Sequence, residues 1–215
     1  MSSSPLGAPV QSKSQARAEY SYAGVKHSFD WCNLGRPTQG GRLVTRPTIV
    51  VEGTMFHLLV VADDSSVYYA EIPLSALSSA TARLNWVRIE GTTAFPVSAV
   101  LSAPNVLDVF ARAPDGSTHW KRRKNSVWGR ILGGKFEENR WGWTALRLRE
   151  RSSLAERIVP FDRPVAVSPW PGRIDLFVNK GDEFGKQPFV NTWDEARMVW
   201  GGFKPMPGSP LCQRA

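Results

Sequence analysis

The stretch "NVLDVFARAPDGSTHW" (Asn105–Trp120) decides the fold class, because it contains every part of a β-hairpin. Its segment "VLDVFAR" alternates with a period of two and is rich in β-forming residues, which predicts a strand. "APDGS" is typical of a tight turn, since Pro presets φ, Asp bonds nearby backbone and Gly accepts a positive φ. The residues from Ser117 onward then predict the returning strand.

This hairpin pattern occurs three times in the chain. Val106–Trp120 aligns without a gap with Met55–Tyr69 ("MFHLLVVADDSSVYY"), and much of the stretch returns in Gly172–Phe184 ("GRIDLFVNKGDEF"). An aspartate recurs in the turn (Asp64, Asp115, Asp182), where we interpret it as a turn former. A second aspartate recurs in the strand (Asp108, Asp175) and is interpreted as a structural group that bonds backbone, with His57 in its place in the first copy.

Similar segments flank each copy of the hairpin. The lead-ins are apolar runs that open after Pro: "RPTIVV" (Arg46–Val51), "FPVSAV" (Phe95–Val100) and "RPVAVS" (Arg163–Ser168). The tails carry Trp: Asn85–Gly91, Trp141–Leu148 and Met198–Pro205, with a fourth such segment at Phe29–Pro37. Four short strands in a unit of about 50 residues fit the blade of a β-propeller.

The sequence therefore predicts an all-β, propeller-type repeat of four-stranded antiparallel blades. We expect a disordered leader at 1–24, an extra strand at about 28–36, blades at about 46–94, 95–162 and 163–210, and a tail at 211–215. Three connections are long: Ser75–Leu84 predicts a helical turn or a loop, Lys124–Arg140 is an insertion, and Arg149–Asp162 predicts a short helix or a loop.

Composition restricts the compartment and the partners. The 215 residues carry a net charge of +8, which favours acidic partners but also serves solubility. No run approaches the roughly 18–20 apolar residues of a membrane span, and residues 1–20 lack the apolar region of a secretory signal. We expect a cytoplasmic protein, or one released without a signal peptide of the usual kind. Cys32 and Cys212 are interpreted as free thiols, with a pairing of the two as the alternative.

The pattern P-x-x-x-S, then R-I/L-D-L/V-F, an Asp-containing turn and a Trp-rich tail resembles the β-propeller lectins of the bacterial PLL type and their fungal relatives. Arg163–Phe184 matches best, and the resemblance covers about Asp30 to Pro210. It implies seven blades with pockets between them for fucose or related sugars. Three blades and one orphan strand depart from that count. The alternatives are a homo-oligomer that completes the propeller, closure by the orphan strand, or a truncated piece of a longer propeller.

A lectin needs aromatic rings for the apolar face of a sugar and polar groups for its hydroxyls. The candidate sugar-binding residues are Tyr69, His119, Trp120, Trp128, Trp170, Arg173 and Trp193. Trp128, Trp170 and Trp193 are placed in loops or at strand ends, whereas Trp86, Trp143 and Trp200 are assigned to packing between blades.

No catalytic or metal signature accompanies these residues, so we expect a non-enzymatic protein without a cofactor. His27, His57 and His119 lack metal-ligand spacing, and no nucleophile elbow occurs. "WKRRKNSVW" (Trp120–Trp128) is interpreted as a solvated strand edge or hairpin, with single-stranded nucleic acid as the less favoured use. The alternatives to a lectin are a protein-interaction scaffold and a basic nucleic-acid binder.

Overall fold

The computed structural model describes residues 17–22, 25–30, 35–37, 41–78, 83–93, 95–132, 135–138, 142–146, 163–182 and 185–206. Across these ranges the backbone is mostly strand, and the helical element is the short 3-10 turn η1 (Leu74–Ser78) in the connection that begins at Ser75. No helix in this part of the chain has the length and apolar character needed to cross a membrane. The connection Arg149–Asp162, both cysteines and the tail lie outside the described residues.

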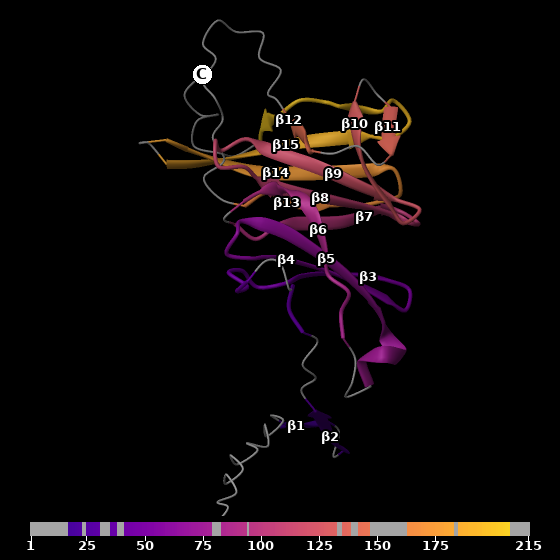
Figure 1. The fold of residues 1–215 in the computed structure, drawn as a ribbon. Helices are drawn as coiled ribbons and strands as arrows, with labels where there is room; N and C mark the ends of the chain where they lie inside the picture. Colours follow the sequence, from indigo (N-terminus) through magenta and orange to yellow (C-terminus); the bar gives the residue numbers. More distant parts are fainter. Residues whose placement is uncertain are drawn as a thin grey trace, which may run out of the picture.

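Four antiparallel sheets organise these strands (Figure 1). A separate hairpin consists of β1 (Arg17–Tyr22) and β2 (Val25–Asp30). The first sheet consists of β3 (Thr48–Glu52), β4 (Met55–Val61), β5 (Ser66–Pro73) and β6 (Val87–Thr92), in that order. The middle sheet consists of β7 (Ser98–Ala103), β8 (Val106–Arg112), β9 (Thr118–Lys124), β10 (Val127–Leu132), β11 (Lys135–Glu138) and β12 (Thr144–Leu146). The third sheet consists of β13 (Val165–Val167), β14 (Arg173–Asp182), β15 (Gly185–Asp194), β16 (Val199–Trp200) and β17 (Lys204–Pro205).

The three larger sheets share one strand order. A lead-in strand pairs with the second strand, the second with the third, and the Trp-bearing tail pairs with the third strand through β6, β12 or β16 and β17. The insertion at Lys124–Arg140 contributes β10 and β11 to the middle sheet. The prediction of an all-β fold with antiparallel sheets is confirmed, and none of the described sheets closes on itself.

The turns confirm the turn-forming role of two aspartates. Asp115 Oδ1 accepts the Ser117 backbone N–H at 2.9 Å, and Gly116 has a φ of 82°. Asp64 Oδ1 accepts the Ser66 backbone N–H at 2.9 Å in the same way. Ser65 takes the place of Gly116 in that turn and holds a φ of 60°, in the left-handed region that few residues other than Gly adopt.

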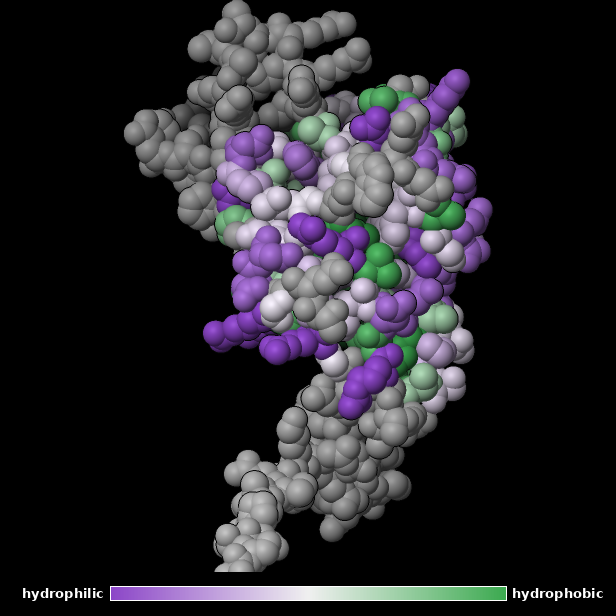
Figure 2. All heavy atoms as spheres, in the orientation of Figure 1, coloured by the Kyte–Doolittle hydropathy of each residue, from purple (hydrophilic) through white to green (hydrophobic). Residues whose placement is uncertain are grey.

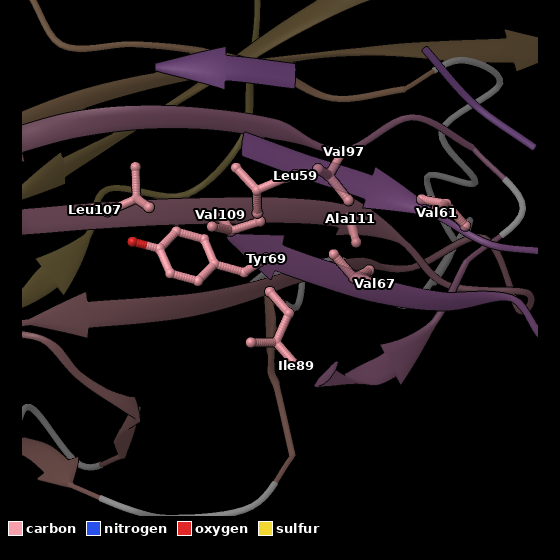
Figure 3. Packing of buried hydrophobic residues seen from close by; sticks show 9 residues of the cluster. All are labelled: Leu59, Val61, Val67, Tyr69, Ile89, Val97, Leu107, Val109 and Ala111. Carbon is pink, nitrogen blue, oxygen red and sulfur yellow. The ribbon is translucent and has the colours of Figure 1, made fainter. Parts of the chain in front are cut away.

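The larger sheets stack face to face, with β7 lying beside both β3 and β13 (Figure 1). The core between the first and middle sheets contains Leu59, Val61, Val67, Tyr69, Ile89, Val97, Leu107, Val109 and Ala111 (Figure 3). The core between the middle and third sheets is more aromatic and contains Phe110, Trp120, Ile131, Leu146, Ile174, Leu176 and Trp193.

Because side chains alternate along a strand, each sheet has two distinct faces. We call the face that carries His57, Asp108 or Asp175 the forward face, and the opposite one the backward face. The forward faces of the first and middle sheets pack on the backward face of the next sheet, as Leu59 and Phe110 show. The forward face of the third sheet, with Asp175 and Phe177, points away from the middle sheet.

The N-terminal expectations need correction. Strand β1 lies inside the range 1–24 that we assigned to a disordered leader, and it pairs residue by residue with β2. The extra strand expected at about 28–36 overlaps β2 only over residues 28–30, and residues 31–34 lie outside the described part of the chain. The sequence pattern missed this hairpin because Arg17–Tyr22 is too polar to stand out from the leader before it.

Candidate functional site

One position of the repeat carries polar side chains in all three larger sheets. His57, Asp108 and Asp175 occupy it on the second strand, and their cross-strand partners are Glu71, Arg122 and Thr192. The forward faces of the first two sheets bury this position against the next sheet, so two polar clusters form at the interfaces.

The first interface cluster lies between the first and middle sheets and consists of Glu52, His57, Tyr69, Glu71, Arg123 and Trp128. His57 Nδ1 lies 2.8 Å from the Tyr69 hydroxyl, which donates to Glu71 Oε2 at 2.8 Å. His57 Nε2 lies 3.3 Å from Glu52 Oε2. Glu52 Oε1 also accepts the backbone N–H of Asn105 at 2.6 Å, which ties the middle sheet to the cluster.

The middle sheet contributes a cation and an indole ring. Arg123 Nη2 donates to Glu71 Oε2 at 2.7 Å, and its guanidinium lies 5.1 Å from the centre of the Tyr69 ring. Trp128 meets the same ring edge-on at 5.1 Å between centroids. Tyr69 is therefore held on three sides, whereas the Glu52 and Glu71 side chains remain 28% and 44% exposed.

The first interface cluster has fewer hydrogen-bonding protons on His57 and Tyr69 than contacts that need one. Burial lowers the pKa of His57, so its imidazole is neutral at pH 7 and carries one proton. Burial and the bond to Glu71 raise the pKa of Tyr69, so the phenol keeps its single proton. Two protons serve the three contacts that run from Glu52 through His57 and Tyr69 to Glu71. The partly exposed carboxylates thus retain acceptor capacity for donors outside the protein.

The second interface cluster lies between the middle and third sheets, and within the described part of the chain its side chains bond one another. It consists of Ser102, Asp108, Trp120, Arg122, Trp193 and Glu195. Asp108 is fully buried and accepts bonds from Trp120 Nε1 at 2.6 Å, from Arg122 Nε at 2.7 Å and from the Ser102 hydroxyl.

Arg122 connects this cluster to the third sheet. Its Nη1 donates to both carboxylate oxygens of Glu195, at 2.9 and 2.7 Å, while Trp193 Nε1 donates to Oε2 of the same residue at 2.7 Å. Burial opposes the charge on Arg122, but the carboxylates of Asp108 and Glu195 outweigh it and raise the pKa of the guanidinium. The Glu195 side chain is 34% exposed, but its carboxylate accepts bonds from both Arg122 and Trp193, so we interpret the second interface cluster as structural.

The candidate residues divide between these places. Tyr69 and Trp128 belong to the first interface cluster, and Trp120 and Trp193 are buried in the second. Trp128 is the second residue of β10 and Trp193 the last but one of β15, so both lie at strand ends, one of the two places expected for them. His119 is half-buried on β9 opposite Ala111, and it belongs to neither cluster among the contacts described.

Trp170 and Arg173 lie together at the third sheet. Trp170 is exposed in the turn before β14, and the Arg173 guanidinium lies 4.4 Å from its ring centre. Arg173 also donates from Nε to both oxygens of Asp175 at 3.1 Å, and Thr192 Oγ1 donates to one of them at 2.7 Å. The strand aspartates therefore bond side chains, and the expectation that they bond backbone was wrong.

The basic run after Trp120 forms a hairpin, as one of its two interpretations held, but most of its cations are not solvated. Lys121, Arg122 and Arg123 are buried, although the sequence led us to place them on a solvated edge. Each has an acceptor: Gly142 O at 3.2 Å for Lys121, and carboxylates from the neighbouring sheets for the two arginines. Sequence reasoning missed Glu52, Glu71 and Glu195 for the same reason, since these partners are distant in the chain. The available signal was His57, which breaks the repeated Asp position.

Comparisons with known proteins assign no family. No family model matches the chain, and no curated protein matches it. One solved structure that resembles it is described as "Crystal structure of polysaccharide lyase Uly1", with a TM-score of 0.44 and 11% identity. The match covers 91% of this chain and 47% of the other, so this chain spans about half the length of that one. At this level the likeness assigns neither a fold nor an activity here.

Two histidines, the buried His57 and the half-buried His119, predict a pH dependence of stability. Burial lowers the pKa of both His57 and His119, so the unfolded chain binds protons more readily than the folded one below about pH 6.5. The contribution of these two neutral histidines to the free energy of unfolding should therefore be complete above that pH. It should fall as the pH drops through the folded pKa values, by at most about 1.4 kcal/mol per pH unit for each histidine.

Urea denaturation between pH 5 and 7 measures this slope. We expect His57→Gln to make it shallower than in the wild type, with His119→Gln as the matched variant outside the clusters. A slope that His57→Gln leaves unchanged contradicts a neutral, buried His57.

Proposed function

We propose that this chain is a non-catalytic carbohydrate-binding protein whose sugar site is the first interface cluster. The observation that carries the proposal is the combination of two partly exposed carboxylates with a Tyr–Trp pair and an arginine where two sheets meet. Carboxylates accept bonds from sugar hydroxyls, and aromatic side chains pack on the apolar face of a sugar ring.

In this proposal the three larger sheets are blades of a propeller, and the sugar binds between two of them. The stacking of the sheets and the row of lead-in strands β3, β7 and β13 support that arrangement. Fucose-like sugars are the first ligands to test, because the lectins that the sequence resembles bind them.

The same geometry favours binding over catalysis. A general base must be deprotonated near the operating pH so that it can accept a proton from the substrate. Tyr69 keeps its proton because its pKa is raised, and His57 is almost fully buried behind Glu52 and Tyr69. The groups left for a ligand are Glu52, Glu71 and Trp128, which suit hydrogen bonding and stacking.

A glycan array followed by calorimetric titration of the sugars that bind tests the proposal. Glu71→Gln removes a charge-assisted hydrogen bond, worth about 1.5–3 kcal/mol, so we expect about tenfold or more weaker binding. Glu137→Gln is the matched control, because Glu137 pairs with Arg130 within the β10–β11 hairpin and lies outside both clusters.

Two outcomes contradict the proposal separately. If no sugar binds at millimolar concentration, the carbohydrate function is wrong. If sugars bind and Glu71→Gln behaves like Glu137→Gln, the site is wrong. Release of new reducing or unsaturated ends from a bound polysaccharide shows catalysis and overturns the non-catalytic assignment.

A further inference from the structure

We infer that the forward face of the third sheet is a docking surface for the backward face of the first sheet of a second copy of this chain. Such a contact is head-to-tail, because it joins two different surfaces. A dimer held by it keeps one free surface of each kind, so further copies can add. The inference goes beyond the proposed function and does not depend on sugar binding.

Exposed apolar side chains mark the forward face of the third sheet. Val165 and Val167 of β13 are 46% and 44% exposed, and they pair across the strands with Phe177 and Asp175 of that face. In the middle sheet the place of Val167 is taken by Val100, which pairs with Asp108 and packs into the core that the third sheet covers. In the first sheet Val50 takes it, pairs with His57 and packs under the middle sheet.

The backward face of the first sheet is exposed at the matching strand. Ile49 and Val51 of β3 are 53% and 51% exposed. Their places in the middle sheet belong to Ala99 and Leu101 of β7, which pack against the core shared with the first sheet. The outer half of this face is covered by Leu43 and Trp86, so the free part is β3 itself.

The geometry that we infer for the contact between copies already occurs within one copy. Two forward-to-backward interfaces exist within one copy, and both bring lead-in strands together: β3 beside β7, and β7 beside β13. Both also carry hydrogen bonds at these strands, from Thr48 Oγ1 to Val97 O at 2.7 Å and from the Ala166 N–H to Ser98 Oγ at 2.9 Å. Placing β13 of one copy beside β3 of the next repeats this geometry.

Trp170 gives the docking surface an anchor. It is 54% exposed at the edge of the forward face, with Arg173 packed on its ring. Trp and Arg dominate the residues that hold protein interfaces together. Figure 2 shows that hydrophilic side chains cover much of the molecule in that view, with hydrophobic ones in smaller groups.

Sedimentation velocity of the full chain over a range of concentrations tests the inference. We expect the wild type to exceed the monomer mass as concentration rises. Val167→Glu and Val51→Glu each place a charge in one half of the contact and should each weaken association at least about tenfold. Leu132→Glu, at an equally exposed apolar residue of β10 away from both faces, should associate like the wild type.

A mixing experiment identifies the head-to-tail geometry. The Val51→Glu variant keeps an intact forward face and the Val167→Glu variant an intact backward face, so an equimolar mixture should form dimers that neither forms alone. A wild type that stays monomeric overturns the inference, as it would if another segment of the chain covered these valines. Dimers of the Val51→Glu variant alone also overturn it, because they show that the third sheet pairs with itself.

Discussion

Replacement of Asp108 by Ala should lower the free energy of unfolding by about 3–5 kcal/mol, the cost of removing one partner from a buried ion pair. Asp108 is fully buried, and it accepts bonds from Arg122 and Trp120. Without it, the buried Nε and Nη2 groups of Arg122 and the buried indole N–H of Trp120 lose their acceptor. Urea denaturation followed by tryptophan fluorescence, at one fixed protein concentration, measures the effect.

The repeat supplies a matched control for this substitution. Asp175 occupies the same place on the third sheet, but its partner Arg173 is about one-third exposed and water can replace the lost carboxylate. We expect Asp175→Ala to cost about 1 kcal/mol or less. Asp108→Asn should fall between the two alanine variants, since its amide oxygen still accepts one bond. Equal losses for Asp108→Ala and Asp175→Ala contradict a structural role that depends on burial.

These two aspartates show what the sequence could and could not predict. Their repetition located them on equivalent strands, because period-two alternation and turn chemistry are local properties of the chain. The residues that cover each aspartate come from distant parts of the chain, and the local sequence does not reveal them. Arg122 links Asp108 to Glu195, which follows β15 of the third sheet. In the described part of the chain, no further sheet covers Asp175.

The buried basic run has the same explanation. Lys and Arg in sequence predict solvent, because an unpaired charge is costly to bury. Arg122 and Arg123 are adjacent and point to opposite faces of the middle sheet, where Glu195 and Glu71 meet them from different neighbours. Only the stacking of three sheets forms these two pairs, Arg122 with Glu195 on one face and Arg123 with Glu71 on the other. A single-strand pattern therefore predicted the strand correctly and the environment of its charges wrongly.

The contrast between the two clusters follows from one change of residue. Where the second interface cluster has an aspartate that accepts bonds from Ser102, Trp120 and Arg122, the first has His57, which supplies a single proton while neutral. The first cluster therefore has one proton fewer than its three contacts between Glu52 and Glu71 need. Sequence reasoning that ranks candidates by residue type gave equal weight to tryptophans from both interfaces, although their surroundings give them different roles.

Replacement of Trp120 by Ala should cost about 3–5 kcal/mol of unfolding free energy, the usual range for truncating a buried Trp. Its ring packs parallel to Phe110 and edge-on against Trp193 and Trp200, at centroid distances of 6.3, 4.8 and 5.3 Å. The truncation leaves a cavity in the most aromatic core of the chain and takes one donor from Asp108.

The matched variant Trp170→Ala removes an indole that is more than half exposed, so the free energy of unfolding should change by no more than about 0.5 kcal/mol. The same variant should weaken self-association, because Trp170 lies at the edge of the proposed docking surface. Urea denaturation and sedimentation velocity on both variants separate these effects: Trp120→Ala should lose stability, and Trp170→Ala should lose association. A Trp120→Ala variant as stable as Trp170→Ala contradicts its place in the core, because a buried indole cannot be removed from a close-packed interface without cost.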